Sequence, residues 1–157
     1  AFGIPTNGIV RATPPADRIA ITRFEAKRLD QTLAKPRESE YVRGEYANGM
    51  RSSNTGGIER FKNTSHGSKE QNGALVGYIQ SGDTNTWLPK INQWIDEEIG
   101  QASDSNLTWN TQDKLGNRQT YSHHDEFESI SVRPNLVDVN LHHFWIPLNR
   151  ASGIDPD

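Results

Sequence analysis

The chain has 157 residues, the length of one ordinary domain. Hydrophobic residues make up 32% of it, below the share of about 45–50% in average globular domains, so we expect a small core and long loops. A net charge of −3 argues against a uniformly basic nucleic-acid coat protein, and the absence of Cys excludes disulfides and thiolate zinc sites.

No apolar run approaches the roughly 20 residues that span a bilayer, and the first residues lack the pattern of a signal peptide. We therefore expect no membrane partner and a cytoplasmic location. We also expect one domain over residues 1–157, with an irregular lead-in at 1–17 and a tail at 149–157.

Hydrophobic periodicity predicts the elements in chain order. Residues 19–29 alternate with period two and predict a strand, whereas 38–51 have a weak helical pattern interrupted by two glycines. Residues 52–73 are polar and predict a long loop with a short turn at 58–61. Residues 74–80 form an apolar run that is typical of a strand buried on both faces.

The second half of the chain contains the clearest pattern. Residues 86–99 place Leu88, Ile91, Trp94 and Ile95 at helical spacing, so they predict an amphipathic helix. A loop is expected at 101–106, a hairpin around 115–117, and a strand over 137–148. Alternating strands and helices predict an α/β fold.

One pair of residues in the first strand suggests chemistry. Glu25 and Lys27 are two positions apart, so their side chains leave the same face of the strand. A carboxylate that holds a divalent metal beside an ammonium that stabilises negative charge is suited to phosphodiester hydrolysis. Taken alone, the pair is more often an ion pair on a solvent face.

Short blocks in a fixed order place this pair in a wider context. The sequence resembles a branch of the PD-(D/E)XK nuclease superfamily over about residues 19–146. The blocks are Phe24–Leu29, Tyr41, Gly57–Phe61, Ala74–Ile79, Phe127–Ser129 with Arg133, and Leu141–Phe144.

The resemblance implies a restriction-endonuclease-like core, with a mixed β-sheet flanked by helices. It also implies DNA as substrate and Mg²⁺ as cofactor, with Mn²⁺ as an alternative. Carried over by position, Glu25 is a metal ligand and Lys27 the catalytic lysine. The family needs a further Asp upstream, and Asp17 either fills that role as a metal ligand and catalytic residue or merely opens the strand.

Several basic residues are candidates for DNA contact: Arg60 first, then Arg28, Lys69 and His143. For Arg60 the alternative is an ion pair with Glu59 or Glu70. For His143 it is a hydrogen-bonded place in the core. His66 shares a polar loop with Lys69, where it either meets DNA or is solvated. The run His123-His124-Asp125-Glu126 could bind a metal, but a solvated loop is the simpler interpretation.

The chain departs from the family pattern at its start. The family begins with a helix and a strand, and only 18 residues precede Ile19. We therefore expect either a C-terminal fragment or a core completed by a homodimer partner or a companion chain. The leading hypothesis is a metal-dependent DNA endonuclease, which the resemblance alone places in a prokaryotic defence or mobile-element system. The alternative is a catalytically inactive module that binds DNA or a protein partner.

Overall fold

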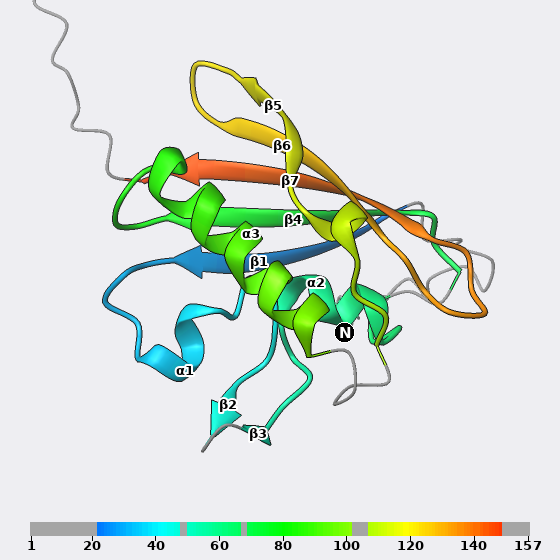
Figure 1. The fold of residues 1–157 in the computed structure, drawn as a ribbon. Helices are drawn as coiled ribbons and strands as arrows, with labels where there is room; N and C mark the ends of the chain where they lie inside the picture. The colour runs from blue at the N-terminus through cyan, green and yellow to red at the C-terminus, as the bar shows by residue number, and fades with distance from the viewer. Residues whose placement is uncertain (1–21, 48–49, 67–68, 102–106, 149–157) are drawn as a thin grey trace, which may run out of the picture.

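Five strands form one mixed, open β-sheet in the computed structural model, which describes residues 22–47, 50–66, 69–101 and 107–148. Three neighbouring strands on one side of the sheet run parallel to each other, and each of the two strands on the other side is antiparallel to the strand before it (Figure 1). Their order across the sheet is β1 (Arg23–Leu29), β4 (Asn72–Ile79), β7 (Val139–Pro147), β6 (Asp125–Ser131) and β5 (Gly116–Thr120). The predicted α/β class is confirmed at this level.

Helices cover one face of this sheet (Figure 1). They are α1 (Lys35–Glu38), α2 (Gly57–Lys62), α3 (Thr84–Gly100) and the 3-10 helix η1 (Thr111–Asp113). A small hairpin of β2 (Tyr46–Ala47) and β3 (Met50–Arg51) projects from the segment between α1 and α2. None of the helices in the described ranges is long and apolar enough for a membrane span.

The elements with strong periodicity are confirmed. The described part of the first predicted strand is β1, and β4, α3 and β7 match the predictions for 74–80, 86–99 and 137–148 to within two residues. Residues 19–21 lie outside the described ranges. Helix α3 starts where the Asp83 carboxylate accepts a hydrogen bond from the Thr86 amide at 2.7 Å, which satisfies one of the free amides of the first turn. One face of β4, with Leu75 and Ile79, is buried. The other face is buried at Ala74 but not at Tyr78, which is 37% exposed.

The predicted helix over 38–51 is wrong. After α1 the chain turns, and the Gly44 amide donates to the Glu59 carboxylate at 2.8 Å instead of continuing a helix. A Cβ at Gly44 would lie 2.0 Å from the Ser53 carbonyl oxygen, so the two segments approach closely only because glycine stands there. Tyr41 and Val42 are buried, and a turn rather than a helix positions them.

Two boundaries also differ from the predictions. The turn expected at 58–61 is the six-residue helix α2. The hairpin exists, but its turn lies at 121–124, and Gly116 and Asn117 begin β5. Asn117 has a φ of 53° at a shift of register in β5, so its turn-like sequence serves a β-bulge.

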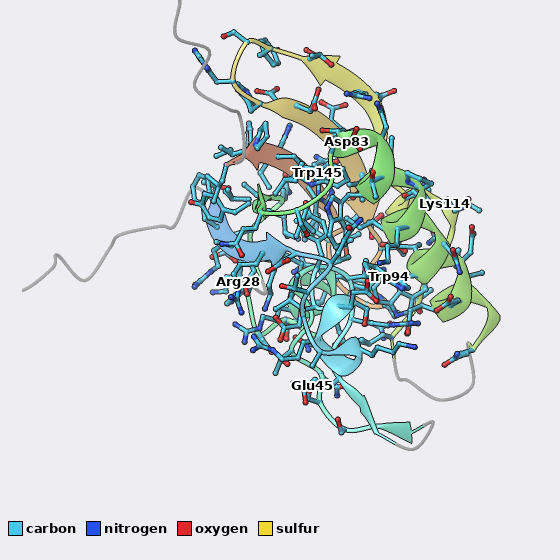
Figure 2. All side chains as sticks on the ribbon, turned by 90° about the vertical axis from the view of Figure 1, so that its left-hand side faces the viewer. Arg28, Glu45, Asp83, Trp94, Lys114 and Trp145 are labelled. Carbon is cyan, nitrogen blue, oxygen red and sulfur yellow. The ribbon has the colours of Figure 1, made fainter. Side chains whose placement is uncertain are left out.

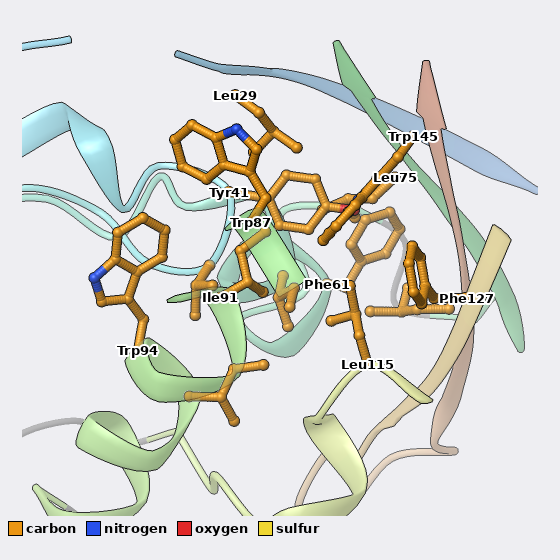
Figure 3. Close-up of a cluster of buried hydrophobic side chains, with 14 of the residues drawn as sticks. Leu29, Tyr41, Phe61, Leu75, Trp87, Ile91, Trp94, Leu115, Phe127 and Trp145 are labelled. Carbon is orange, nitrogen blue, oxygen red and sulfur yellow. The ribbon is translucent and has the colours of Figure 1, made fainter. Parts of the chain in front are cut away.

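The core lies between the sheet and α3 (Figure 3). Trp87, Ile91 and Ile95 of α3 pack against side chains of the sheet such as Leu75 and Trp145. In Figure 2 Trp145 lies between the strands and α3. All four tryptophans are buried, so they form the core rather than a stacking surface for bases.

A polar chain runs through this core. The Trp145 indole N–H donates to the Tyr41 hydroxyl at 2.9 Å, and this hydroxyl lies 2.8 Å from Nδ1 of His143. Nε2 of His143 lies 2.9 Å from the Ser129 hydroxyl. All groups are satisfied when Tyr41 donates to Nδ1 and His143 keeps its proton on Nε2.

This arrangement corrects one predicted site residue. His143 is fully buried and uses both ring nitrogens inside the protein, so it has no atom to offer a phosphate of DNA. The alternative interpretation, a hydrogen-bonded core histidine, is confirmed. Burial, and less strongly the charge of His142, lower the pKa of His143 to about 3.

Replacing Tyr41 with Phe tests the polar chain. The substitution leaves the Trp145 N–H and Nδ1 of His143 buried without a partner, so we expect a loss of about 1–3 kcal/mol in the free energy of unfolding. Urea denaturation measures it. The control is Tyr121→Phe, because Tyr121 is exposed and its hydroxyl donates to the side chain of Gln119, and its loss should be below about 0.5 kcal/mol. Equal losses in both variants would contradict the assigned role.

The pKa of His143 predicts a dependence of stability on pH. Between pH 6.5 and about 3 the unfolded chain binds a proton at this ring and the folded chain does not, so stability falls as the pH falls through this window. The contribution approaches about 1.4 kcal/mol per pH unit. Denaturation at several pH values measures the slope, and NMR of the histidine ring protons should show His143 not titrating between pH 5 and 8. A midpoint near 6.5 would contradict the burial argument.

Candidate functional site

Strand β1 presents Glu25 and Lys27 on the face that the helices cover. The strand alternates, so these two residues and Leu29 point inward while Phe24 and Arg28 point to the opposite, exposed face. The Lys27 Nζ lies 3.1 Å from Oε1 of Glu25, and the two side chains are only 13% and 11% exposed. The pair is therefore largely withdrawn from water, unlike an ordinary surface ion pair.

Lys27 also contacts the segment that precedes α2. Its Nζ donates to the backbone carbonyl oxygen of Thr55 at 3.3 Å. The ammonium thus bridges a carboxylate of β1 and a carbonyl of the loop over 52–56. A lysine with two such acceptors is held in one place beside Glu25.

Helix α2 brings a second cation to the carboxylate. Arg60 Nη1 lies 3.5 Å from Oε2 of Glu25, so Arg60 pairs with Glu25 and not with Glu59 or Glu70. Glu59 instead accepts the amides of Gly44 and Gly56, whereas Glu70 pairs with Arg23.

The position of α2 is fixed at its first turn. The amides of its first three residues donate to consecutive backbone carbonyls of the preceding segment. These bonds run from Gly57, Ile58 and Glu59 to Glu40, Tyr41 and Val42. They satisfy amides that a helix leaves free at its start. These bonds therefore fix the start of α2 and, with it, the position of Arg60.

The turn after α2 supplies the closest contact. His66 Nε2 lies 2.5 Å from Oε2 of Glu25. The His66 amide donates to the Arg60 carbonyl at 3.0 Å, and the ring meets the edge of Phe61 at a centroid distance of 5.7 Å. Within this turn Thr64 has a φ of 64°, which is strained for a β-branched residue. The turn is held in a costly conformation that places His66 over Glu25.

The electrostatics of Glu25 follow from these neighbours. Burial raises its pKa, but hydrogen bonds from His66 and Lys27 and the charges of Lys27 and Arg60 outweigh burial and leave the pKa below its usual value. Glu25 is therefore ionised at neutral pH. One carboxylate stands among two permanent cations and an imidazole, which makes the cluster positive overall.

The donors around Glu25 fit a divalent ion in part. Glu25 offers a carboxylate oxygen and His66 an imidazole nitrogen, and an ion that keeps several waters needs few protein ligands. In the described part of the chain, no three or more His, Asp or Glu side chains are arranged so that they could hold a metal ion. Asp17, the predicted second carboxylate, lies outside the described residues.

The other predicted residues within the described ranges make no contact with Glu25. Arg28 is exposed on the other face of β1 and is labelled at that strand in Figure 2. Lys69 is exposed in the segment between α2 and β4. In the His123–Glu126 run, Asp125 is buried and accepts bonds from Thr84, Thr120 and Arg118, while His124 pairs with Glu126 at 2.9 Å.

The sequence pointed to Glu25, Lys27 and Arg60 but not to two of their partners. The sequence predicts His66 only as a candidate for DNA contact, and it does not predict the contact with the Thr55 carbonyl. A backbone carbonyl leaves no trace in a sequence. For His66 the available signal was a single histidine in a polar loop shortly after Arg60.

Comparisons with known proteins add no relative. No protein-family model matches the chain, and neither the curated proteins nor the solved structures contain a match to it. The residues around Glu25 therefore carry the candidate function.

Proposed function

We propose that this protein is a metal-dependent endonuclease that hydrolyses DNA phosphodiester bonds on a restriction-endonuclease-like core. The observation that supports the proposal best is the largely buried contact between Glu25 and Lys27, 3.1 Å apart on one strand. Strands β1 and β4 are parallel neighbours, and the chain between them contains α2 and Arg60. This order of elements is compatible with the family resemblance.

Each residue of the cluster has a role in this proposal. Glu25, with Asp17, would hold Mg²⁺ or Mn²⁺, and the bound ion would activate water and screen the charge of the phosphate. Lys27 would orient the attacking water and stabilise the additional negative charge. Its bond to the Thr55 carbonyl keeps it at that position. Arg60, which is 32% exposed, would turn from Glu25 to a phosphate oxygen.

One observation favours the second candidate, an inactive module that binds DNA or a protein partner. Both oxygens of Glu25 already contact positive or hydrogen-bonding groups, and the described residues supply only this carboxylate to the cluster. A homodimer partner or a companion chain would then complete the core. The positive cluster would still attract a phosphate backbone.

Replacing Lys27 with Ala separates the two candidates. In the first, cleavage of plasmid DNA with Mg²⁺ or Mn²⁺ should fall by about a hundredfold or more, because a group that stabilises developing charge is lost. The initial rate of plasmid nicking measures it. The matched control is Lys114→Ala, since Lys114 pairs with Asp96 beside α3 and should leave the rate unchanged.

Equal rates for wild type and Lys27→Ala would contradict the nuclease proposal. Absence of cleavage by the wild type, together with DNA binding that Lys27→Ala retains, would select the inactive module. A melting curve for each variant shows whether it is folded.

Arg60 gives a separate prediction for DNA binding. If Arg60 contacts one phosphate, Arg60→Ala should reduce the slope of log K against log salt by about 1, whatever the sequence of the duplex. Fluorescence anisotropy at several salt concentrations, without divalent ions, measures the slope. Arg37→Ala is the control, because Arg37 is also an arginine paired with a carboxylate, Glu40, but lies in α1. An unchanged slope in Arg60→Ala would remove Arg60 from the interface.

A further inference from the structure

The imidazole of His66 faces two oxygen acceptors. Its Nε2 lies 2.5 Å from Oε2 of Glu25, and its Nδ1 lies 3.1 Å from the backbone carbonyl oxygen of Ser65. A neutral imidazole has only one N–H, so one of its nitrogens would turn a lone pair toward an oxygen. Both contacts are favourable together only when Nδ1 carries the N–H toward the Ser65 carbonyl and Nε2 presents to Glu25 either a second proton or a metal ion.

The surroundings of His66 resemble those of a metal ligand. Metal-binding histidines usually donate their other ring N–H to a carboxylate or a backbone carbonyl, and here the Ser65 carbonyl lies at Nδ1. The amide of His66 is bound to Arg60, and its ring packs against Phe61. A side chain fixed at its backbone, ring face and second nitrogen loses little freedom when it binds an ion.

From this geometry we propose that His66 is a second protein ligand of the ion held by Glu25, and that the pair selects a first-row transition ion over Mg²⁺. The proposal rests on the proposed function only in taking Glu25 as a metal ligand. Imidazole nitrogen suits transition ions, whereas Mg²⁺ favours a shell of oxygens. Mn²⁺, which accepts carboxylate oxygen, water and imidazole, is the probe.

The change in geometry that this binding needs is small. Two donors at right angles and about 2.1 Å from one ion are about 3 Å apart, so Glu25 and His66 would separate by only about half an ångström. The ion takes the place of the proton on Nε2, which leaves to solvent. Lys27 contacts the other oxygen, Oε1, so it need not move. Arg60 shares Oε2 and is the group that would turn away.

Metal binding without DNA tests the proposal. Isothermal titration of the full chain with Mn²⁺ and with Mg²⁺ should give tighter binding of Mn²⁺, and His66→Ala should weaken Mn²⁺ binding by roughly tenfold or more. The effect on Mg²⁺ should be smaller. The matched control is His124→Ala, because His124 also pairs with a glutamate, Glu126, but on the hairpin of β5 and β6 rather than at Glu25. It should bind Mn²⁺ as the wild type does.

Electron spin echo spectroscopy of Mn²⁺ bound to the wild type supplies a readout that does not depend on folding of a variant. It should show coupling to one directly bound imidazole nitrogen, absent in His66→Ala. Lack of this coupling, or equal Mn²⁺ affinity in wild type and His66→Ala, would overturn the proposal. Plasmid cleavage by the same wild type is scored separately. Cleavage with no nitrogen coupling leaves the nuclease proposal intact, and nitrogen coupling without cleavage leaves the His66 proposal intact.

Discussion

A carboxylate withdrawn from water must be surrounded by donors and cations, and the arrangement of the first half of this protein follows from that requirement at Glu25. Its side chain is 11% exposed, and an unpaired charge in such a place would cost several kcal/mol. Lys27 comes from the same strand, Arg60 from α2, and His66 from the turn after α2. Three pieces of chain therefore meet at one group, and the positions of α2 and of the strained turn at Thr64 make sense as parts of its environment.

Two other buried ionisable sites are stabilised in different ways, one by an ion pair and one by hydrogen bonds to a neutral ring. Lys62 and Asp113 are both buried and lie 2.7 Å apart, and Lys62 also donates to the Thr108 carbonyl. Burial lowers the pKa of Lys62 and raises that of Asp113, and their mutual attraction opposes both shifts. His143 instead stays neutral within a chain of hydrogen bonds. The ion pair ties α2 to η1, whereas the histidine chain ties β6 and β7 to Tyr41, so polar contacts fix elements that are far apart in sequence.

The sequence predicts the elements that bury an apolar face, but it does not predict those that remote polar contacts position. Helix α3 and strands β4 and β7 bury an apolar face, and such a face is written locally as a period of 3.6 or 2. The segment 38–51 had no such face of its own. Gly44 and Tyr41 are placed there by Glu59 and by the core, both of them remote, and no local pattern could reveal that. Asn117 misled for a related reason, because a residue that favours a positive φ suits a bulge as well as a turn.

The candidate site shows most clearly which contacts a sequence can and cannot predict. Glu25 and Lys27 are neighbours on one strand, so alternation alone brings them together, and Arg60 belongs to a short block with a recognisable order. His66 reaches Glu25 across 41 residues only because the α2 helix and its turn have particular lengths and angles. His143 had the better pattern, being on an apolar strand among aromatic residues, and that pattern put it in the core and away from any ligand.

The contacts of Glu25 also determine how tightly a ligand can bind to its carboxylate. A ligand that needs Oε2 competes with His66 and Arg60, so its apparent affinity is its intrinsic affinity reduced by the free energy of displacing them. A ligand that offers new partners to the displaced groups recovers that free energy. In the proposed nuclease, a metal would do so for His66 by taking its Nε2, and a phosphate would do so for Arg60 by accepting its N–H groups. An ion alone would leave Arg60 without its contact to Oε2, and a phosphate beside the ion would restore a partner to Arg60. In the proposed nuclease, a phosphate would therefore compensate for the contact that the ion takes from Arg60, and metal-assisted phosphodiester chemistry needs both groups bound together.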